Sequence, residues 1–359
     1  MIPPGPIRPV HHTVRLVICY RNFSAHRGIS HIGLGVSAMQ NARALRALGY
    51  IVEIWPLADG AELADKLAHD RITAELAHHV PVSHVVIHAP WVPGALLAGL
   101  AYRYNDIEFC VVCHSNLGFL QVDPGAIALM RAYSALEQTA PNFHIGANGD
   151  RLQAWWTATY GTRMLLLPNM YPFDSIRQRP QWRGGTLRIG CFGAMRPQKN
   201  VLTAAGAALE VGVRLRVTDL EFWTSGGRVE AGGGSIVLAI QQMYLGMPRA
   251  RWVARNWQSW TDFLVSLGSM DLLLQPSYTE SFNMVTADGI ARAIPSVIGE
   301  AIDWAPRNWI AACDSAADIA NKAIALLHDP GAMQEGVAAL TAHNQAALRE
   351  WESFLAVQP

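Results

Sequence analysis

Hydrophobic positions along the chain fall into short apolar runs of strand length, and longer segments with helical spacing separate many of them. In the first half, the predicted strands are residues 14–20, 51–55, 82–89, 107–113, 143–147 and 164–167. The predicted helices of this half are residues 34–48, 124–138 and 150–159. Strands that alternate with helices predict a parallel sheet with helices on both faces.

The second half repeats this pattern. Its predicted strands are residues 187–192, 213–218, 251–255, 271–275 and 295–299. Its predicted helices are residues 201–211, 236–244, 259–267, 282–293 and 314–329, with one or two more within 331–355. Residues 171–185 are rich in Pro, Arg and Gly and read as a linker, and the glycine-rich residues 226–235 predict a mobile loop. The sequence therefore predicts an α/β protein with two doubly wound, Rossmann-like domains.

Composition narrows the class of protein. The 359 residues suffice for two domains of ordinary size, and 51% of them are hydrophobic. The 28 Lys and Arg residues equal the 28 Asp and Glu residues, so the overall charge does not favour strong nonspecific binding to nucleic acid or acidic lipid. Residues 1–10 do not resemble a signal peptide, and residues 89–104 are too short and too interrupted to span a bilayer. Five scattered cysteines favour a reduced, cytoplasmic setting.

Residues 110–114, Cys-Val-Val-Cys-His, match the attachment pattern for haem c. The segment reads as a buried strand, in which an offset of three places the two cysteines on opposite faces. Haem attachment, a zinc site and a redox pair are all disfavoured by this geometry.

The stretch 271–299 carries the first candidate site. An apolar strand ends in a loop, and a helix follows at about residue 282, so the turn lies at the edge of a parallel sheet where ligands bind. Glu280 precedes the helix and Asp288 lies inside it. Amides at the start of the helix, at Asn283, Met284 and Val285, favour an anion. An ordinary strand–helix–strand unit with an acid near the helix dipole is the alternative.

A second strand–helix junction carries cations. Arg196 and Lys199 follow the strand 187–192 and precede a helix. Arginine offers a planar fork to two phosphate oxygens, and lysine adds a compact charge, so this loop suits a diphosphate. A solvated loop with two charges is the alternative.

The first half offers weaker candidates. Gly33 and Gly35 lie in a glycine-rich strand–helix connection, where a backbone can approach a phosphate, although a plain flexible loop fits equally well. His114 stands at the carboxyl end of a predicted strand, where sites gather, or it merely closes that strand.

These motifs resemble those of retaining glycosyltransferases of family 4. The family pattern has two glutamates separated by seven residues, with Gly-Phe-Gly after the first and an Arg-x-x-Lys at an earlier junction. Here Arg196 and Lys199 match, Glu280 matches, Asp288 replaces the second glutamate, and Asn283 adds bulk and an amide where the sugar would sit. The resemblance covers most of residues 186–330 and, more loosely, residues 14–170.

The resemblance implies a GT-B architecture of two domains facing across a cleft. The N-terminal, acceptor-side domain would span residues 1–170 and the linker 171–185. The nucleotide-sugar-binding domain would span 186–335, and a terminal helix within 336–359 would return to the N-terminal domain.

The resemblance also implies roles for the site residues. The enzyme would transfer a sugar from a nucleotide-sugar donor with retention of anomeric configuration. Arg196 and Lys199 would neutralise the leaving diphosphate without a metal or other cofactor, Glu280 would orient the donor sugar, and Asp288 would hold the ribose. His114 would contact the sugar or the developing oxocarbenium charge, and Gly33 and Gly35 would face the diphosphate.

Other readings remain open at this point. The acceptor could be a saccharide, a lipid carrier, a small molecule, a protein or a modified nucleic-acid base. Arg43 and Arg46 alone do not favour stable membrane docking. The same architecture would serve a nucleotide-sugar 2-epimerase or a catalytically silent nucleotide-sugar-binding module.

Overall fold

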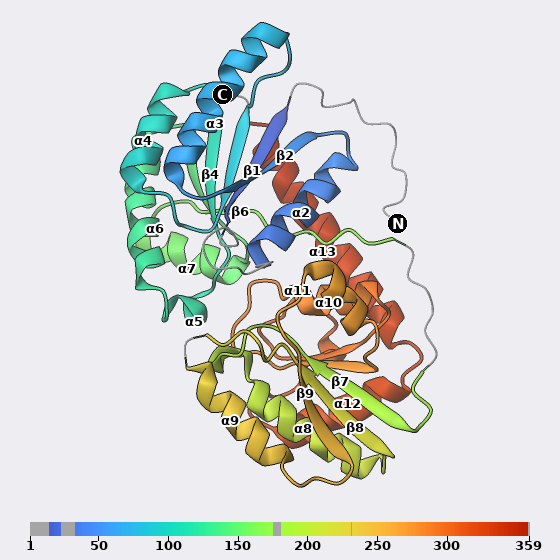
Figure 1. The fold of residues 1–359 in the computed structure, drawn as a ribbon. Coiled ribbons are helices and arrows are strands. Elements are labelled where there is room, and N and C mark those ends of the chain that lie inside the picture. Colours follow the sequence, from blue (N-terminus) through green and yellow to red (C-terminus); the bar gives the residue numbers. More distant parts are fainter. Residues whose placement is uncertain (1–13, 23–32, 175–180, 231, 358–359) are drawn as a thin grey trace. The chain divides into compact units, whose positions relative to one another are not determined.

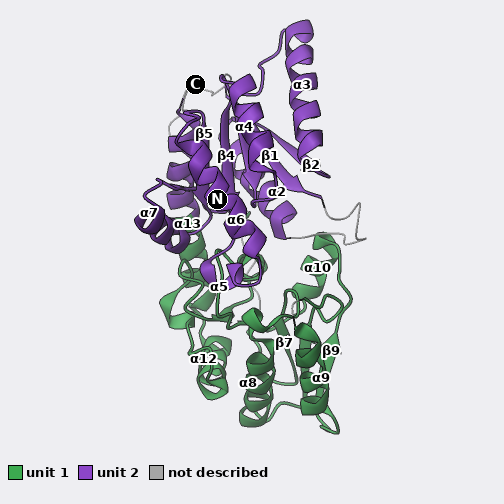
Figure 2. Ribbon diagram, turned by 90° about the vertical axis from the view of Figure 1, so that its left-hand side faces the viewer, with its two compact units in different colours: residues 1, 173–343 green, residues 2–172, 344–359 purple. Residues whose placement is uncertain are grey.

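A computed structural model describes residues 14–22, 33–174, 181–230 and 232–357. The expectations for residues 1–10 and for part of the linker therefore lie outside the described residues. The chain divides into two compact units, one formed by Phe173–His343 and the other by the residues before them together with Asn344–Pro359 (Figure 2).

The unit that begins the chain contains a parallel sheet of six strands in the order β2-β1-β3-β4-β5-β6 (Figure 1). Its strands are β1 (Arg15–Arg21), β2 (Ile51–Leu57), β3 (His84–His88), β4 (Glu108–Cys113), β5 (Phe143–Ala147) and β6 (Leu165–Leu166). Its helices are α2 (Gly33–Arg46), α3 (Gly60–Ala77), α4 (Gly94–Arg103), α5 (Leu117–Leu120), α6 (Pro124–Glu137) and α7 (Asp150–Tyr160). Because the chain runs from β1 to β2 and then to β3 on the opposite side, the strand order reverses between β1 and β3.

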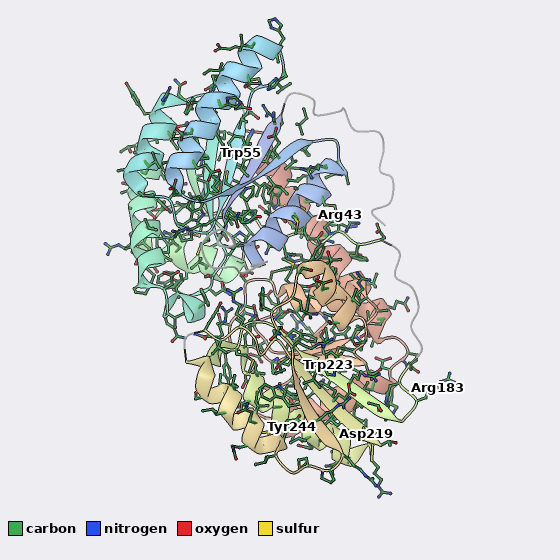
Figure 3. All side chains as sticks on the ribbon, viewed as in Figure 1. Arg43, Trp55, Arg183, Asp219, Trp223 and Tyr244 are labelled. Atoms are coloured by element: carbon green, nitrogen blue, oxygen red, sulfur yellow. The ribbon has the colours of Figure 1, made fainter. Side chains whose placement is uncertain are left out.

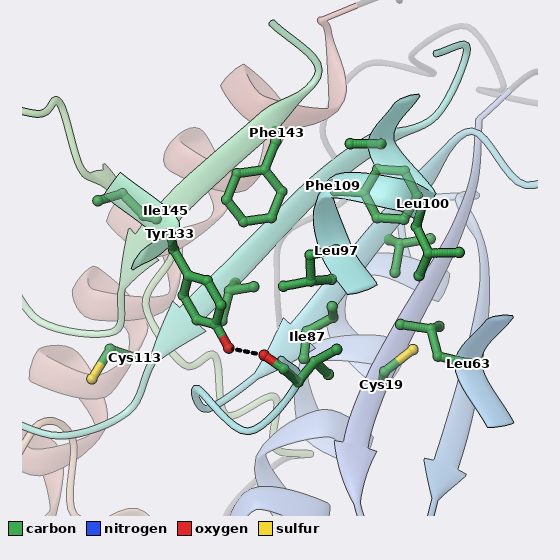
Figure 4. Close-up of a cluster of buried hydrophobic side chains, with 14 of the residues drawn as sticks. Cys19, Leu63, Ile87, Leu97, Leu100, Phe109, Cys113, Tyr133, Phe143 and Ile145 are labelled. Carbon is green, nitrogen blue, oxygen red and sulfur yellow. Dashed lines mark hydrogen bonds between the residues drawn. The ribbon is translucent and has the colours of Figure 1, made fainter. Parts of the chain in front are cut away.

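Two hydrophobic clusters sandwich this sheet. One packs side chains of α3, α4, α6 and α7 on one face, where Phe109 and Phe143 are buried and the Tyr133 hydroxyl donates to the backbone oxygen of Val92 at 2.5 Å (Figure 4). The other face carries α2 and the end of α13 (Ala332–Leu355). There Trp351 is fully buried and its Nε1 donates to the backbone oxygen of Pro168 at 2.9 Å. The last turns of the chain therefore complete this unit's core.

The second unit contains a parallel sheet of five strands in the order β11-β10-β7-β8-β9. Its strands are β7 (Thr186–Cys191), β8 (Asp219–Thr224), β9 (Ala250–Ala254), β10 (Leu272–Gln275) and β11 (Ser296–Ile298). Its helices are α8 (Val201–Arg214), α9 (Gly233–Tyr244), α10 (Trp260–Leu267), α11 (Met284–Ala291) and α12 (Ala316–His328). The strand order reverses between β7 and β10, because β8 and β9 extend the sheet on one side and β10 and β11 on the other.

Helices again cover both faces of this sheet. Helices α10 and α11 enclose a cluster with Phe192, Leu273 and Ile294 at its centre. On the other face α8 packs against α9, and the hydroxyl of Tyr244, labelled in Figure 3, donates to the backbone oxygen of Ala205 at 3.1 Å. The prediction of an α/β protein with two doubly wound parallel sheets is confirmed.

One predicted strand is wrong. Residues 213–218 contain the end of α8 and a turn with Arg216 at φ 50°, and β8 begins only at Asp219. The alternation of Val213, Leu215 and Val217 looked like a strand, yet Val213 is 70% exposed at the end of the helix. Helices α3 and α4 were not predicted, and residues 332–355 form one helix.

Candidate functional site

The candidate site lies at the carboxyl edge of the five-stranded sheet, where the loops after β7 and β10 leave neighbouring strands at the reversal of strand order. Open α/β sheets bind ligands at this kind of position. Two contacts join the loops: the amide of Tyr278 donates to the Gln198 oxygen at 3.0 Å, and Asn200 Nδ2 donates to the Pro276 oxygen at 3.1 Å. The topology therefore places the cationic loop beside the loop that carries Glu280.

The loop after β7 presents Arg196 and Lys199. Gly193 has φ 121°, and a Cβ there would lie 3.4 Å from Lys199 Cε, so glycine lets the lysine side chain run across the backbone. Pro197–Lys199 form one 3₁₀ turn, and Asn200, at φ 54°, separates this turn from α8. The short turn fixes both cations at the start of α8, as the motif predicted.

Glu280 meets Lys199 directly, with 2.5 Å between Oε1 and Nζ. The two side chains are only 10% and 13% exposed, respectively. Burial raises the pKa of Glu280, but Lys199, the hydroxyl of Ser277 and the charge of Arg196 together hold that pKa below its ordinary value. The carboxylate is therefore ionised at neutral pH and can accept hydrogen bonds from hydroxyl groups.

Asn283 occupies the N-cap of α11 with φ 67°, a backbone conformation that favours glycine and that asparagine tolerates. Its Oδ1 accepts the amide of Thr286 at 2.9 Å, and its Nδ2 donates to Glu280 at 2.9 Å and to Gln275 Oε1 at 3.2 Å. The asparagine amide thus braces the carboxylate. Next to it, Met284 and Val285 form the first turn of α11, and Val285 packs its side chain on the Phe192 cluster.

Asp288 lies one turn further along α11 and is 2% exposed. Its Oδ1 accepts the indole hydrogen of Trp260 Nε1 at 3.2 Å. Trp260 opens α10, which follows β9, so this contact adds a third loop to the same edge of the sheet.

Sequence reasoning missed two charged residues of this edge, Arg228 and Glu230, in the loop after β8. Arg196 Nη1 donates to Glu230 Oε2 at 3.2 Å, and Arg228 Nε donates to Glu230 Oε1 at 2.6 Å. The reason they were missed is that the strand was predicted at residues 213–218, too early in the sequence. With the strand placed correctly, ending at Thr224, the charged residues that follow it would have been predicted to lie at the carboxyl edge of the sheet. The glycine-rich stretch predicted to be a mobile loop holds these ion pairs.

The other predicted residues belong to the six-stranded unit, at the carboxyl edge of its own sheet. Gly33 and Gly35 lie in the first turn of α2 rather than in a loop. A Cβ on Gly33 would meet nothing within 4 Å, whereas one on Gly35 would lie 3.2 Å from the ring of Tyr20. Gly35 therefore lets the end of β1 pack closely against α2.

His114 follows β4 directly, and its ring centroid lies 4.3 Å from that of His88, which ends β3. Burial lowers the pKa of His88 to about 3, and burial together with His88 lowers the pKa of His114 well below its ordinary value. Both imidazoles are neutral at physiological pH. His88 is fully buried, whereas His114 is partly exposed, so that only the neutral ring of His114 can form hydrogen bonds with hydroxyl groups of a ligand.

Three further features concern metal binding, membrane spanning and the cysteines. The described part of the chain holds no group of three or more His, Cys, Asp or Glu side chains that could bind a metal ion. Among the same residues, no helix is long and apolar enough to cross a membrane. All five cysteines are free, and burial raises the pKa of Cys113 and Cys191 to about 12.

Comparisons with known proteins identify the fold. No protein-family model matches the chain, and a sequence search of curated proteins finds no match. Sucrose-phosphate synthase from Thermosynechococcus elongatus matches 95% of this chain with 96% of its own, at a TM-score of 0.61 and 14% identity. A UDP-forming α,α-trehalose-phosphate synthase from Burkholderia vietnamiensis matches 96% of this chain with 98% of its own, at a TM-score of 0.59 and 11% identity.

A mutant of S. aureus TarM, solved with fondaparinux, α-GlcNAc-glycerol and UDP, matches at a TM-score of 0.55 and 13% identity. That match covers 76% of this chain, and the chain spans 55% of the length of TarM. At these identities the likeness establishes the fold: the chain has the GT-B fold of two Rossmann-like units.

Proposed function

We propose that this chain is a glycosyltransferase that moves a sugar from a nucleotide-sugar donor to an acceptor, with retention of configuration and without a metal. The observation that carries the proposal is the Lys199–Glu280 pair at the reversal of strand order, with Arg196 close enough to lower the pKa of the same carboxylate. The two cations that can bind a diphosphate, Arg196 and Lys199, therefore lie next to an ionised carboxylate, Glu280, that can accept hydrogen bonds from hydroxyl groups.

Arg196, Lys199 and Glu280 have different roles in the proposed reaction. As the bond from the anomeric carbon to the diphosphate breaks, negative charge builds on the leaving oxygen, and preorganised cations stabilise it. Arg196 and Lys199 supply that charge. Glu280, kept ionised and braced by Asn283, accepts hydrogen bonds from donor-sugar hydroxyl groups and fixes the orientation of the ring.

The remaining residues bind the donor. The amides of Met284 and Val285, at the start of α11, face the anionic part of the donor. Asp288, beside Trp260, holds the ribose. Gly33 and Gly35 lie next to the diphosphate. Neutral His114 contacts the sugar, where its imidazole tolerates the developing oxocarbenium charge. We name no general base, because the leaving phosphate can take the acceptor's proton.

Two of the structural neighbours are associated with UDP, which agrees with this chemistry without deciding it for this chain. TarM was solved with UDP, and the Burkholderia vietnamiensis synthase is described as UDP-forming.

The acceptor stays open among a saccharide, a lipid carrier, a small molecule, a protein and a modified nucleic-acid base. We propose a cytoplasmic location, because all five cysteines are free.

An assay for released nucleotide tests the proposal. The protein is incubated with a panel of nucleotide sugars in excess EDTA, with and without a panel of acceptors. Nucleotide release that requires an acceptor, with an α-linked product from an α-linked donor, supports it. Donor isomerisation without an acceptor would identify an epimerase, and donor binding without turnover a silent binding module. Activity that EDTA abolishes and manganese or magnesium restores would refute metal independence.

A further inference from the structure

The carboxylate of Glu230 stands between two arginines in the loop after β8. Arg196 Nη1 lies 3.2 Å from Glu230 Oε2, whereas Arg228 binds the other oxygen through Nε at 2.6 Å and also through Nη2. The Arg228 guanidinium in turn lies over the ring of Trp257, 4.6 Å from its centroid. We call these four residues the Glu230 cluster.

Backbone contacts hold the cluster in place. The amide of Met195 donates to the Arg228 oxygen at 2.8 Å, and the amide of Glu230 donates to the Met195 oxygen at 3.0 Å. A Cβ on Gly233 would lie 1.9 Å from that Met195 oxygen, so only glycine permits this approach. The loop is therefore fastened alongside the residue that precedes Arg196, and Glu230 stays within reach of the guanidinium.

The two arginines hold Glu230 unequally. Arg228 makes a short two-pronged contact and is braced by an aromatic ring, whereas Arg196 makes a longer contact through Nη1. If Arg196 turned to another anion, Glu230 would keep a charged partner, and no carboxylate would be left uncompensated. Two guanidinium groups on one carboxylate also leave an excess positive charge, which attracts an anion to this edge.

We propose that Glu230 competes internally with the donor's diphosphate for Arg196, and that it keeps Arg228 as its partner when the diphosphate binds. This inference rests on the proposed function, because it assumes a nucleoside diphosphate group at Arg196. The exchange lowers the affinity for the nucleoside diphosphate product and so favours its release. Glu230 is thus a positioning residue that acts on the ligand through Arg196.

Isothermal titration calorimetry tests this proposal with UDP, GDP, ADP, CDP and dTDP and with the matched nucleosides. Glu230→Gln keeps the shape of the side chain and removes its charge. We expect its Kd for the nucleoside diphosphate that binds wild type to fall about 1.5- to fivefold, the range that exposed ion pairs contribute. The Kd for the matched nucleoside should not change. In an Arg196→Ala background, Glu230→Gln should lose most of its effect.

Glu210→Gln is the matched control, because Glu210 forms an exposed ion pair with Arg214 at the same 3.2 Å separation. It should leave every Kd unchanged, and thermal melting should show that all variants are folded. Weaker or unchanged binding by Glu230→Gln, or an equal gain in the Arg196→Ala background, would overturn the competitor role. If no nucleoside diphosphate bound folded wild type or the variant, the donor site itself would be refuted, and this inference with it.

Discussion

At the scale of single residues, Glu280 shows how neighbours decide the charge of a buried group. Burial favours the neutral acid, yet Lys199 at 2.5 Å, the Ser277 hydroxyl and the charge of Arg196 reverse that preference and lower its pKa. A group whose pKa is lower in the folded protein than in the unfolded chain stabilises the fold above its unfolded pKa. That stability is lost as the pH falls through the folded value.

Removing the lysine should expose this dependence. In Lys199→Met the buried carboxylate loses its counter-charge, and we expect the free energy of unfolding at neutral pH to fall by ~3 kcal/mol. The double variant Lys199→Met/Glu280→Gln should recover most of the loss, because no lone charge remains. Urea denaturation from pH ~7 to ~3 measures this, and the gap between wild type and Lys199→Met should close toward acid. A gap independent of pH would contradict the assignment.

Arg196 should matter mainly for turnover. If it stabilises charge on the leaving diphosphate, Arg196→Ala should lower kcat by ~10²–10³, as the loss of one aligned donor of hydrogen bonds does in other enzymes. Steady-state kinetics with varied donor concentration measures the effect, and circular dichroism checks the fold. Wild-type turnover in this variant would show that the diphosphate lies elsewhere.

Asp288 should instead affect donor binding. A ribose contact is made equally in the ground and transition states, so Asp288→Ala should raise the donor KM and leave kcat nearly unchanged. Asp288→Glu introduces the glutamate found in the family 4 glycosyltransferases that the motif resembles, but the site is 2% exposed and its carboxylate already meets Trp260. One more methylene there should cost ~1–3 kcal/mol of stability. Thermal melting and the same kinetics separate the two effects, and a fully stable Asp288→Glu would show that the pocket has spare room.

At the scale of elements, the start of α11 depends on the backbone conformation of one residue. Asn283 has φ 67°, caps the amide of Thr286 and donates to Glu280. Its side chain therefore stabilises the helix and aims the carboxylate, a combination that glycine at the same position cannot provide.

Two substitutions separate these contributions. Asn283→Gly keeps the backbone conformation and loses the cap, whereas Asn283→Ala loses the cap and also strains the backbone. We expect Asn283→Ala to be less stable than Asn283→Gly by ~1 kcal/mol. Equilibrium unfolding of both variants gives the difference. Equal stability would mean that α11 begins in another backbone conformation.

At the scale of the whole molecule, the end of the chain belongs to the core of the unit that begins it. Ala347, Trp351, Phe354 and Leu355 are buried in the cluster on one face of the six-stranded sheet. Residues from the two ends of the sequence thus share one hydrophobic core, while Phe173–His343 form the other unit.

Deletion of residues 344–359 should therefore act on one unit only. Without these side chains, one face of the six-stranded sheet keeps α2 but loses the packing of α13. Trp351 is fully buried there, and replacing a buried tryptophan by alanine costs ~3–5 kcal/mol. Hydrogen exchange followed by mass spectrometry should show faster exchange in β1, β3 and β4 and unchanged protection in β7, β8 and β10. Equal loss of protection in both sheets would contradict the division.

The amino-acid sequence determined most of this molecule by itself: the alternation of strands and helices, two parallel sheets, and the two motifs at Arg196–Lys199 and Glu280–Asp288. These features depend on local periodicity and on charges at the ends of apolar runs, which a single chain segment already contains. Where local patterns were ambiguous, the sequence misled, as at residues 213–218, whose alternation ends a helix instead of forming a strand.

Only the tertiary structure decided which charges meet. Lys199 and Glu280 are 81 positions apart, and Arg196 and Glu230 are 34 apart, so no local pattern connects them. Their pairing follows from the strand order, which places the loops after β7 and β10 side by side and fastens the loop after β8 to Met195. The same holds for Trp260 with Asp288 and for His88 with His114. Contacts between distant segments are fixed by packing, because burial and ion pairing act through space and not along the chain.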